Sequence, residues 1–172
     1  MAKVLRIDDF SDVELSIKSS GIPNPQGIYT EVVDILRMEC NINENDINEK
    51  KYSHEKQRDT EVVSSEIRAY KGLDKFSKLY FKIKIFIEMK PAKAEEYDYV
   101  GDVEIRGTGR VRTEYPQENW LQQSILWHAF RVFYEKLIYG DVKEVYIQKC
   151  NKYMRILRDD VKSYFDMLPT VR

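Results

Sequence analysis

Apolar and polar side chains alternate without a break over residues 79–89, and this pattern predicts a long β-strand. One parity holds only large apolar residues, namely Leu79, Phe81, Ile83, Ile85, Ile87 and Met89. The other parity holds polar and aromatic residues, namely Lys78, Tyr80, Lys82, Lys84, Phe86, Glu88 and Lys90. Because successive side chains of a strand point to opposite faces, the first set should form part of a core and the second should face solvent or a partner.

Two more alternating stretches flank this strand. Residues 63–70 precede it, separated by a turn at residues 71–74, and a third strand follows over residues 97–113 after a second turn. This order predicts a three-stranded antiparallel meander. Gly107 and Gly109 interrupt the third strand, and we expect a β-bulge there because glycine weakens strand pairing.

Opposite charges on the outer face of the meander predict its register. If Lys90 faces Glu96, the pairs between the second and third strands are Lys84 with Asp102, Lys82 with Glu104, and Tyr80 with Arg106. On the other side of the central strand, the same reasoning places Glu66 beside Lys82 and Arg68 beside Tyr80. We therefore expect an outer face lined with ion pairs.

The N-terminal part of the chain predicts an edge strand at residues 3–7 followed by two helices. Ser11 and Glu14 match the capping box that opens a helix, although residues 13–17 alternate and leave a strand open as the alternative. A second helix, with a proline in its first turn, is predicted over residues 25–38.

Residues 41–59 are rich in charged and amide side chains and nearly free of large apolar groups. Such a segment can bury little surface, so we expect it to be mobile and exposed. A solvated connection is the simpler interpretation, and a lid or binding loop is the alternative.

The C-terminal part predicts two long helices. The first begins at Pro116, ends at Gly140 and is apolar on two sides. The second begins at Asp141 and ends at Pro169, with one apolar stripe made of Tyr146, Cys150, Tyr153, Leu157, Val161, Tyr164 and Leu168. The stripe suits a helical hairpin within one chain or a homo-oligomer interface through Tyr146, Tyr153, Leu157 and Tyr164.

Together these elements predict a single α+β domain over residues 1–172. A short strand and two helices would occupy residues 1–40, the polar segment residues 41–59, the meander residues 60–114, and the two long helices residues 116–168. The sheet would have three or four strands, with helices packed on one face and a long C-terminal helical hairpin. This order of elements resembles the helix-grip arrangement, in which a curved sheet and its last helix hold an apolar ligand.

Composition narrows the classes of partner. The chain has 172 residues, 42% of them hydrophobic and 33% charged, and a formal charge of −1. A chain near neutrality has no overall field that would draw it to nucleic acid or an anionic membrane. It begins without an apolar core of signal-peptide length, and no apolar run is long enough to cross a bilayer, so we expect a cytoplasmic protein without a membrane partner.

Metal and redox chemistry find little support in the sequence. Cys40 and Cys150 form no CxxC pair, and the only histidines are His54 and His128. We expect two reduced, packed thiols, and neither a zinc site nor another cofactor.

Two groups of residues could carry catalysis. Asp102 and Glu104 share a strand face at a spacing that could divide acid and base roles, but the lysines predicted opposite them would keep both ionised. His128 lies one turn from Ser124 on a predicted helix, where a histidine is more often structural than catalytic. Because no known catalytic motif is present, we expect a binding or assembly module, with a small-molecule enzyme as the third alternative.

An apolar small ligand or a protein partner could bind between the central strand and the C-terminal helices. The candidate lining residues are Phe81, Ile83, Ile85, Trp120, Trp127, His128 and Tyr134. These residues combine large rings with a few polar groups, as ligand pockets do. The alternative is a closed core, because large apolar residues on one strand face tend to fill the space.

Single-stranded nucleic-acid binding through the outer sheet face is the second function considered. That face would carry cations and a ring, namely Arg68, Lys78, Tyr80, Lys82, Lys84, Arg106, Arg110 and Arg112. Such a mixture can contact phosphates and stack on bases. Carboxylates on the same face cancel much of this charge, so nucleic acid is not the favoured partner.

Overall fold

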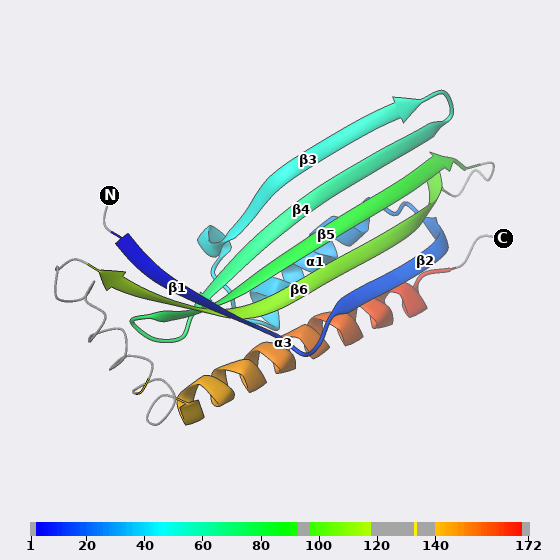
Figure 1. The fold of residues 1–172 in the computed structure, drawn as a ribbon. Helices are drawn as coiled ribbons and strands as arrows, with labels where there is room; N and C mark the ends of the chain where they lie inside the picture. The colour runs from blue at the N-terminus through cyan, green and yellow to red at the C-terminus, as the bar shows by residue number, and fades with distance from the viewer. Residues whose placement is uncertain (1–2, 93–96, 118–132, 134–139, 170–172) are drawn as a thin grey trace.

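The computed structural model describes residues 3–92, 97–117, 133 and 140–169, and its centre is a six-stranded antiparallel sheet (Figure 1). The strands are β1 (Lys3–Phe10), β2 (Leu15–Pro23), β3 (Ile47–Gln57), β4 (Thr60–Gly72), β5 (Ser77–Pro91) and β6 (Tyr99–Gln117). They lie in the order β1-β6-β5-β4-β3, and β2 pairs with β6 as well. The helical elements are α1 (Gly27–Met38), the short 3₁₀ helix η1 (Glu44–Asp46) and α3 (Gly140–Met167).

The predicted fold class is wrong in two respects. The sheet has six strands instead of three or four, and the described residues contain the single helices α1 and α3 in place of a C-terminal hairpin. Pro116 does not open a helix, because β6 continues to Gln117 and pairs along its last residues with β1. The remainder of the predicted first helix, residues 118–139, lies outside the described residues except for Phe133.

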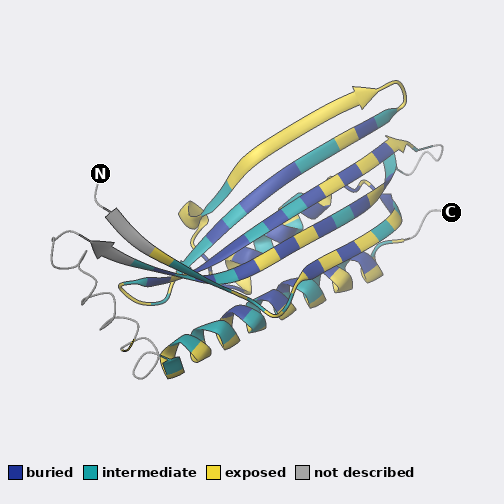
Figure 2. Cartoon of the chain, viewed as in Figure 1, coloured by how far each residue is buried: buried dark blue, intermediate teal, exposed yellow. Residues whose placement is uncertain are grey.

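The meander and the face assignment of its central strand are confirmed. β4, β5 and β6 are consecutive antiparallel neighbours, and every apolar residue from Leu79 to Met89 on the predicted core parity is buried. Figure 2 shows this alternation as buried and exposed bands along β5. The spacing of apolar residues was therefore sufficient to predict which side of the sheet forms the core.

The predicted register is wrong on both sides of β5. Lys84 lies opposite Arg106 instead of Asp102, and Glu66 lies opposite Lys84 instead of Lys82. Both differences are even numbers of residues, so each side chain keeps its predicted face. Outer-face ion pairs contribute only about 0.2–1 kcal/mol each, which is too little to fix a register against backbone and core packing.

Gly107 and Gly109 do not form the predicted bulge, because the register between β5 and β6 is continuous across them. They permit close packing instead. A Cβ atom at Gly107 would lie 3.0 Å from Leu15 Cδ2, and one at Gly109 would lie 2.8 Å from Cys150 Sγ. The glycines thus let β2 and α3 approach the sheet.

Two segments near the N-terminal half differ from the main prediction. Residues 15–23 form strand β2, the alternative to a helix, whereas α1 confirms the second predicted helix. Residues 41–59 contain η1 and the 11-residue strand β3 in place of a mobile connection. β3 is the edge of the sheet, and most of its residues are exposed (Figure 2).

α1 and α3 lie on the same side of the sheet. α3 runs along β2 and β6, and α1 lies beside α3 behind the middle strands (Figure 1). The buried residues of α3 are Cys150, Met154, Leu157, Val161 and Phe165. β3 lies at the far edge of the sheet from α3, and most of its residues are exposed.

Within the described ranges, no helix combines the length and the apolar character that a membrane crossing requires.

Candidate functional site

The structure separates the residues that were predicted to line a ligand site. Phe81 and Ile83 are buried under the helices, and the Phe81 ring packs edge-on against Tyr153 with 6.4 Å between centroids. Trp120, Trp127, His128 and Tyr134 lie outside the described residues. Of the predicted residues that the structure describes, Ile85 lines a cavity beside α1.

A cleft of about 330 Å³ lies between α1 and the sheet. We call it the α1 cleft. Its lining residues are Gln26 and Tyr29 from the start of α1, Tyr52 and His54 from β3, Val63 and Ser65 from β4, and Ile85, Ile87 and Met89 from β5. The β5 residues Ile85, Ile87 and Met89 form an apolar floor. The α1, β3 and β4 residues form the walls and supply the polar groups.

The register of the sheet builds this floor from rows of residues on the helix side. One row is Tyr52, Ser65 and Ile85, the next is His54, Val63 and Ile87, and the last is Lys56, Glu61 and Met89. Each row runs from the edge strand to the buried centre of the sheet, so its polarity falls in that direction. An apolar group can lie over β5 while a polar group faces β3.

The last row ends in a network around a buried carboxylate. Glu61 is 7% exposed, and Lys56 Nζ donates to its Oε1 atom over 2.7 Å. His54 Nε2 lies 3.0 Å from Glu61 Oε2. Hydrogen bonds from Lys56 and His54 lower the pKa of Glu61, while the carboxylate raises the pKa of Lys56. Both members of the pair are therefore charged near neutral pH.

A second carboxylate, that of Glu49, lies exposed at the rim of the polar wall and does not line the cleft itself. The Ser65 hydroxyl donates to Glu49 Oε1 over 2.7 Å. Burial, together with the negative charge of Glu49, raises the pKa of Tyr29. Tyr29 is thus a neutral phenol near neutral pH, and Glu49 forms no ion pair within the part of the chain that the structure describes.

This arrangement suits binding better than covalent catalysis. The Ser65 hydroxyl donates to Glu49 and His54 contacts Glu61, so these two side chains are engaged with different carboxylates and do not form a nucleophile and base. Over the described ranges, no cluster of three or more histidine, cysteine, aspartate or glutamate residues could hold a metal ion.

Most of the outer-face cations considered for nucleic-acid binding form ion pairs with carboxylates. Arg68 contacts Glu66 at 2.6 Å, Arg106 contacts Glu104 at 2.6 Å, and both Arg110 and Arg112 contact Asp8, at 3.2 and 2.8 Å. Lys82 lies 3.5 Å from Glu66. Glu66 and Asp8 each contact two of these cations, so a phosphate would have to compete with carboxylates already in place. Lys78 and Lys84 form no ion pair among the described residues, so some positive charge remains on this face.

Tyr80, the ring predicted to stack on bases, is covered by its neighbours. The guanidinium carbons of Arg110 and Arg112 lie 4.2 and 4.7 Å from its ring centroid, and the residue is 5% exposed. A base could reach this ring only after both arginines moved.

The residues of the hypothetical oligomer interface face their own sheet. Leu157 is 1% exposed, and Tyr153 accepts a hydrogen bond from Lys71 over 2.9 Å. Tyr146 donates to Asp74 over 2.8 Å, and Tyr164 packs against the core. The stripe therefore belongs to the intramolecular packing of α3.

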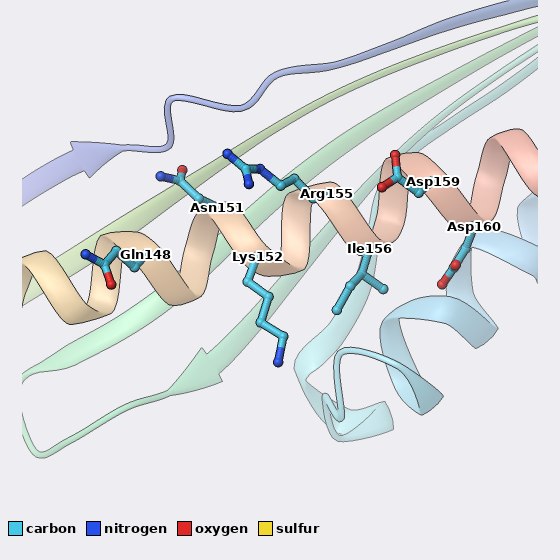
Figure 3. Close-up of a pocket in the computed structure, with 7 residues that line it drawn as sticks. All are labelled: Gln148, Asn151, Lys152, Arg155, Ile156, Asp159 and Asp160. Carbon is cyan, nitrogen blue, oxygen red and sulfur yellow. The ribbon is translucent and has the colours of Figure 1, made fainter.

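A second hollow runs along the solvent side of α3 (Figure 3). Charged residues border it, and the side chains do not converge: Asn151 and Arg155 project from one side of the helix, while Lys152 and Ile156 project from the other. Asn151 is engaged with the loop before β2, because its Oδ1 accepts from the amide of Asp12 over 3.0 Å. This hollow has no floor comparable with that of the α1 cleft.

Comparison with known proteins gives no further guide to the site. No protein-family model matches the chain, and no curated protein matches it. The function must therefore be inferred from the residues of the α1 cleft themselves.

Sequence reasoning missed Tyr29, Tyr52, His54 and Ser65 as site residues. The available signal was the alternation of Tyr52, His54 and Lys56 with smaller or acidic residues in a segment that looked like a polar connection. An edge strand that is open on both faces has little apolar content, so its period-two pattern is carried by polar and aromatic side chains.

Proposed function

We propose that this protein is a non-enzymatic binding protein that holds a small, partly apolar molecule in the α1 cleft. The observation that carries the proposal is the juxtaposition of an apolar floor, Ile85 and Ile87, with a wall of phenol, imidazole and hydroxyl groups from β3 and β4. Small-molecule sites combine these two features. The predicted ligand position between sheet and helix is retained, but α1 replaces the C-terminal helices as its wall.

The size of the cleft limits the ligand. About 330 Å³ lies near the lower end of the usual range for small-molecule sites, roughly 300–1,000 Å³. At the ~30 Å³ that a water-sized group occupies in a liquid, this space holds roughly ten non-hydrogen atoms. A medium-length alkyl chain with one polar group fits that limit.

The position of β3 explains why the cleft is open. α3 covers β2 and β6, whereas β3 is the sheet edge and Tyr52 on it is 61% exposed. At the other end, Gln26 Nε2 contacts Met89 Sδ at 3.4 Å and closes the space against α1. A ligand can therefore enter from the β3 side and meet the core at β5.

A matched pair of substitutions on β4 tests this function. Val63 lines the cleft, while its neighbour Val62 points to the outer face and is exposed. Isothermal titration calorimetry with decylammonium, decanol and decanoate should detect binding of at least one probe to the wild type. Val63→Phe should fill the cleft and abolish that binding, and Val62→Phe should leave it unchanged.

The proposal would be wrong if none of the three probes bound to the folded wild-type protein. Binding that was equally strong in Val63→Phe and the wild type would also contradict it, because the probe would then occupy another surface. Circular dichroism of both variants ensures that folded proteins are compared.

A further inference from the structure

A β-bulge in β3 brings a carboxylate to the helix side of the sheet. Glu49 pairs with a β4 residue that faces the helices, the register shifts at Lys50, and Tyr52 again pairs with such a residue. Positions 49 and 52 would face opposite sides of a regular strand, but the bulge places both on one side. The hydrogen bond from Ser65, which lines the cleft, to Glu49 agrees with this placement.

The charges around the cleft do not cancel. Lys56 and Glu61 form a close pair at 2.7 Å, and His54 is also directed to Glu61. Among the described residues, Glu49 forms no ion pair and accepts a hydrogen bond from the neutral Ser65 hydroxyl. The negative charge of Glu49 is therefore left without a paired cation among these residues.

Two aromatic rings line the cleft, and the charge of Glu49 acts on one of them, that of Tyr29. Tyr29 comes from α1 and Tyr52 from β3, so they approach the cleft from different elements. The raised pKa of Tyr29 keeps its phenol neutral, and the faces of such rings attract cations. Carboxylate and rings together provide an environment that favours positive charge over negative charge.

We infer that the ligand of the α1 cleft is an alkylammonium compound, with its nitrogen beside Glu49 and its chain along Ile85 and Ile87. This inference rests on the proposed function, because it specifies the chemical class of the molecule bound at the same site. The ammonium group would donate to Glu49, and the alkyl chain would cover the apolar floor.

An anionic ligand such as a fatty acid would be poorly matched. Its carboxylate would need Lys56 or His54, and both already contact Glu61. Removing either contact would weaken the compensation of a carboxylate that is 7% exposed. A neutral alcohol would avoid this penalty and could donate a hydrogen bond to Glu49, but it would lack the attraction between opposite charges.

The experiment compares decylammonium, decanol and decanoate by calorimetry at neutral pH, below their micelle concentrations. The wild type should bind decylammonium about tenfold more tightly than decanol, a difference of about 1.4 kcal/mol, and decanoate more weakly than either. Glu49→Gln should remove the preference for the amine by lowering the affinity for decylammonium to about that for decanol. Glu55→Gln makes the same charge change on the outer face of β3 and should keep the preference.

The outcomes separate this inference from the proposed function. If decanol or decanoate bound at least as tightly as decylammonium, and Val63→Phe abolished that binding, the ligand class would be wrong and the cleft would still be a binding site. An amine preference that survived Glu49→Gln would also overturn the inference. If no probe bound, the proposed function and the ligand class would both fail.

Discussion

Gly109→Ala tests how closely α3 is seated on β6. A Cβ atom at this position would lie 2.8 Å from both Cys150 Sγ and Met154 Cγ, whereas non-bonded carbon atoms prefer about 3.5–4.0 Å. Both neighbours are completely buried, so any movement away from the new methyl group must be made within the packed core. Overpacking of this kind typically costs about 1–3 kcal/mol, and we expect about 2 kcal/mol here.

Urea and thermal unfolding followed by circular dichroism measure this change. For a chain of this size, each kcal/mol lowers the melting temperature by about 2–4 °C, so Gly109→Ala should melt roughly 4–8 °C below the wild type. Gly72→Ala is the matched control, because nothing lies within 4 Å of the added Cβ atom. Its unfolding free energy should stay within about 0.5 kcal/mol of the wild type.

A double-mutant cycle identifies the cause. Cys150→Ala removes the sulfur atom that the new methyl group would meet, so the double variant should be more stable than the sum of the single changes predicts. If Gly109→Ala unfolded like the wild type, the close approach of α3 to β6 would be refuted. Strict additivity with Cys150→Ala would show that the sulfur is not the obstacle.

Three further predictions follow from the packing and the charges. The pKa of Glu61 is lowered below its usual 4.5, so the stability that its ionised form contributes is complete above pH 4.5 and is lost as the pH falls through the lower pKa of the folded state. The unfolding free energy of Glu61→Gln should therefore depend less on pH in the acid range than that of the wild type. An unchanged pH profile would contradict the pairing. Leu157→Ala should lower the free energy of unfolding, measured in urea, by about 2–5 kcal/mol. Light scattering should show the same oligomeric state as for the wild type. Dissociation of an oligomer would contradict the assignment of Leu157 to intramolecular packing. Fluorescence anisotropy at low ionic strength should show no binding of an unstructured oligonucleotide, and salt-dependent binding that the joint Tyr80→Ala and Arg106→Ala change abolished would restore the nucleic-acid interpretation.

The parts of the fold that could be predicted depend on side-chain parity. Leu79 to Met89 bury one face of β5, and this requires only that apolar residues recur at every second position. The same reasoning cannot predict the register between strands. When one strand slides by an even number of residues along its neighbour, every side chain stays on the same face of the sheet. The opposition of Lys84 and Arg106, two like charges, shows that outer-face pairing does not decide the alignment.

The edge strand predicted at residues 3–7 is present as β1, but the end of β6 and the whole of β3 were missed. β1 pairs with the end of β6, so residues near Pro116 extend the sheet although their local sequence suggests the start of a helix. Among the described strands, β3 pairs with β4 alone, and its polar sequence resembles a loop. Local propensity cannot reveal either pairing, because the stabilising contacts come from the sheet as a whole.

The candidate site could be predicted only in outline. The idea of a ligand between sheet and helix needed only the apolar face that includes Ile85. The actual walls require the pairing of Tyr52 with Ser65 and the bulge at Lys50 that turns Glu49 toward the cleft. A bulge depends on the relative alignment of two strands, so the sequence of β3 alone does not determine where it occurs.

Mapping a bound probe onto the sheet tests the central claim most directly. Two-dimensional NMR of isotope-labelled protein records the amide chemical shifts during titration with decylammonium. The largest shift changes should lie along the row formed by Tyr52, Ser65 and Ile85. The same row should show no shift changes in Val63→Phe. The account would be contradicted if saturating probe left these amides unchanged, or if the largest shifts lay on the outer face around Tyr80.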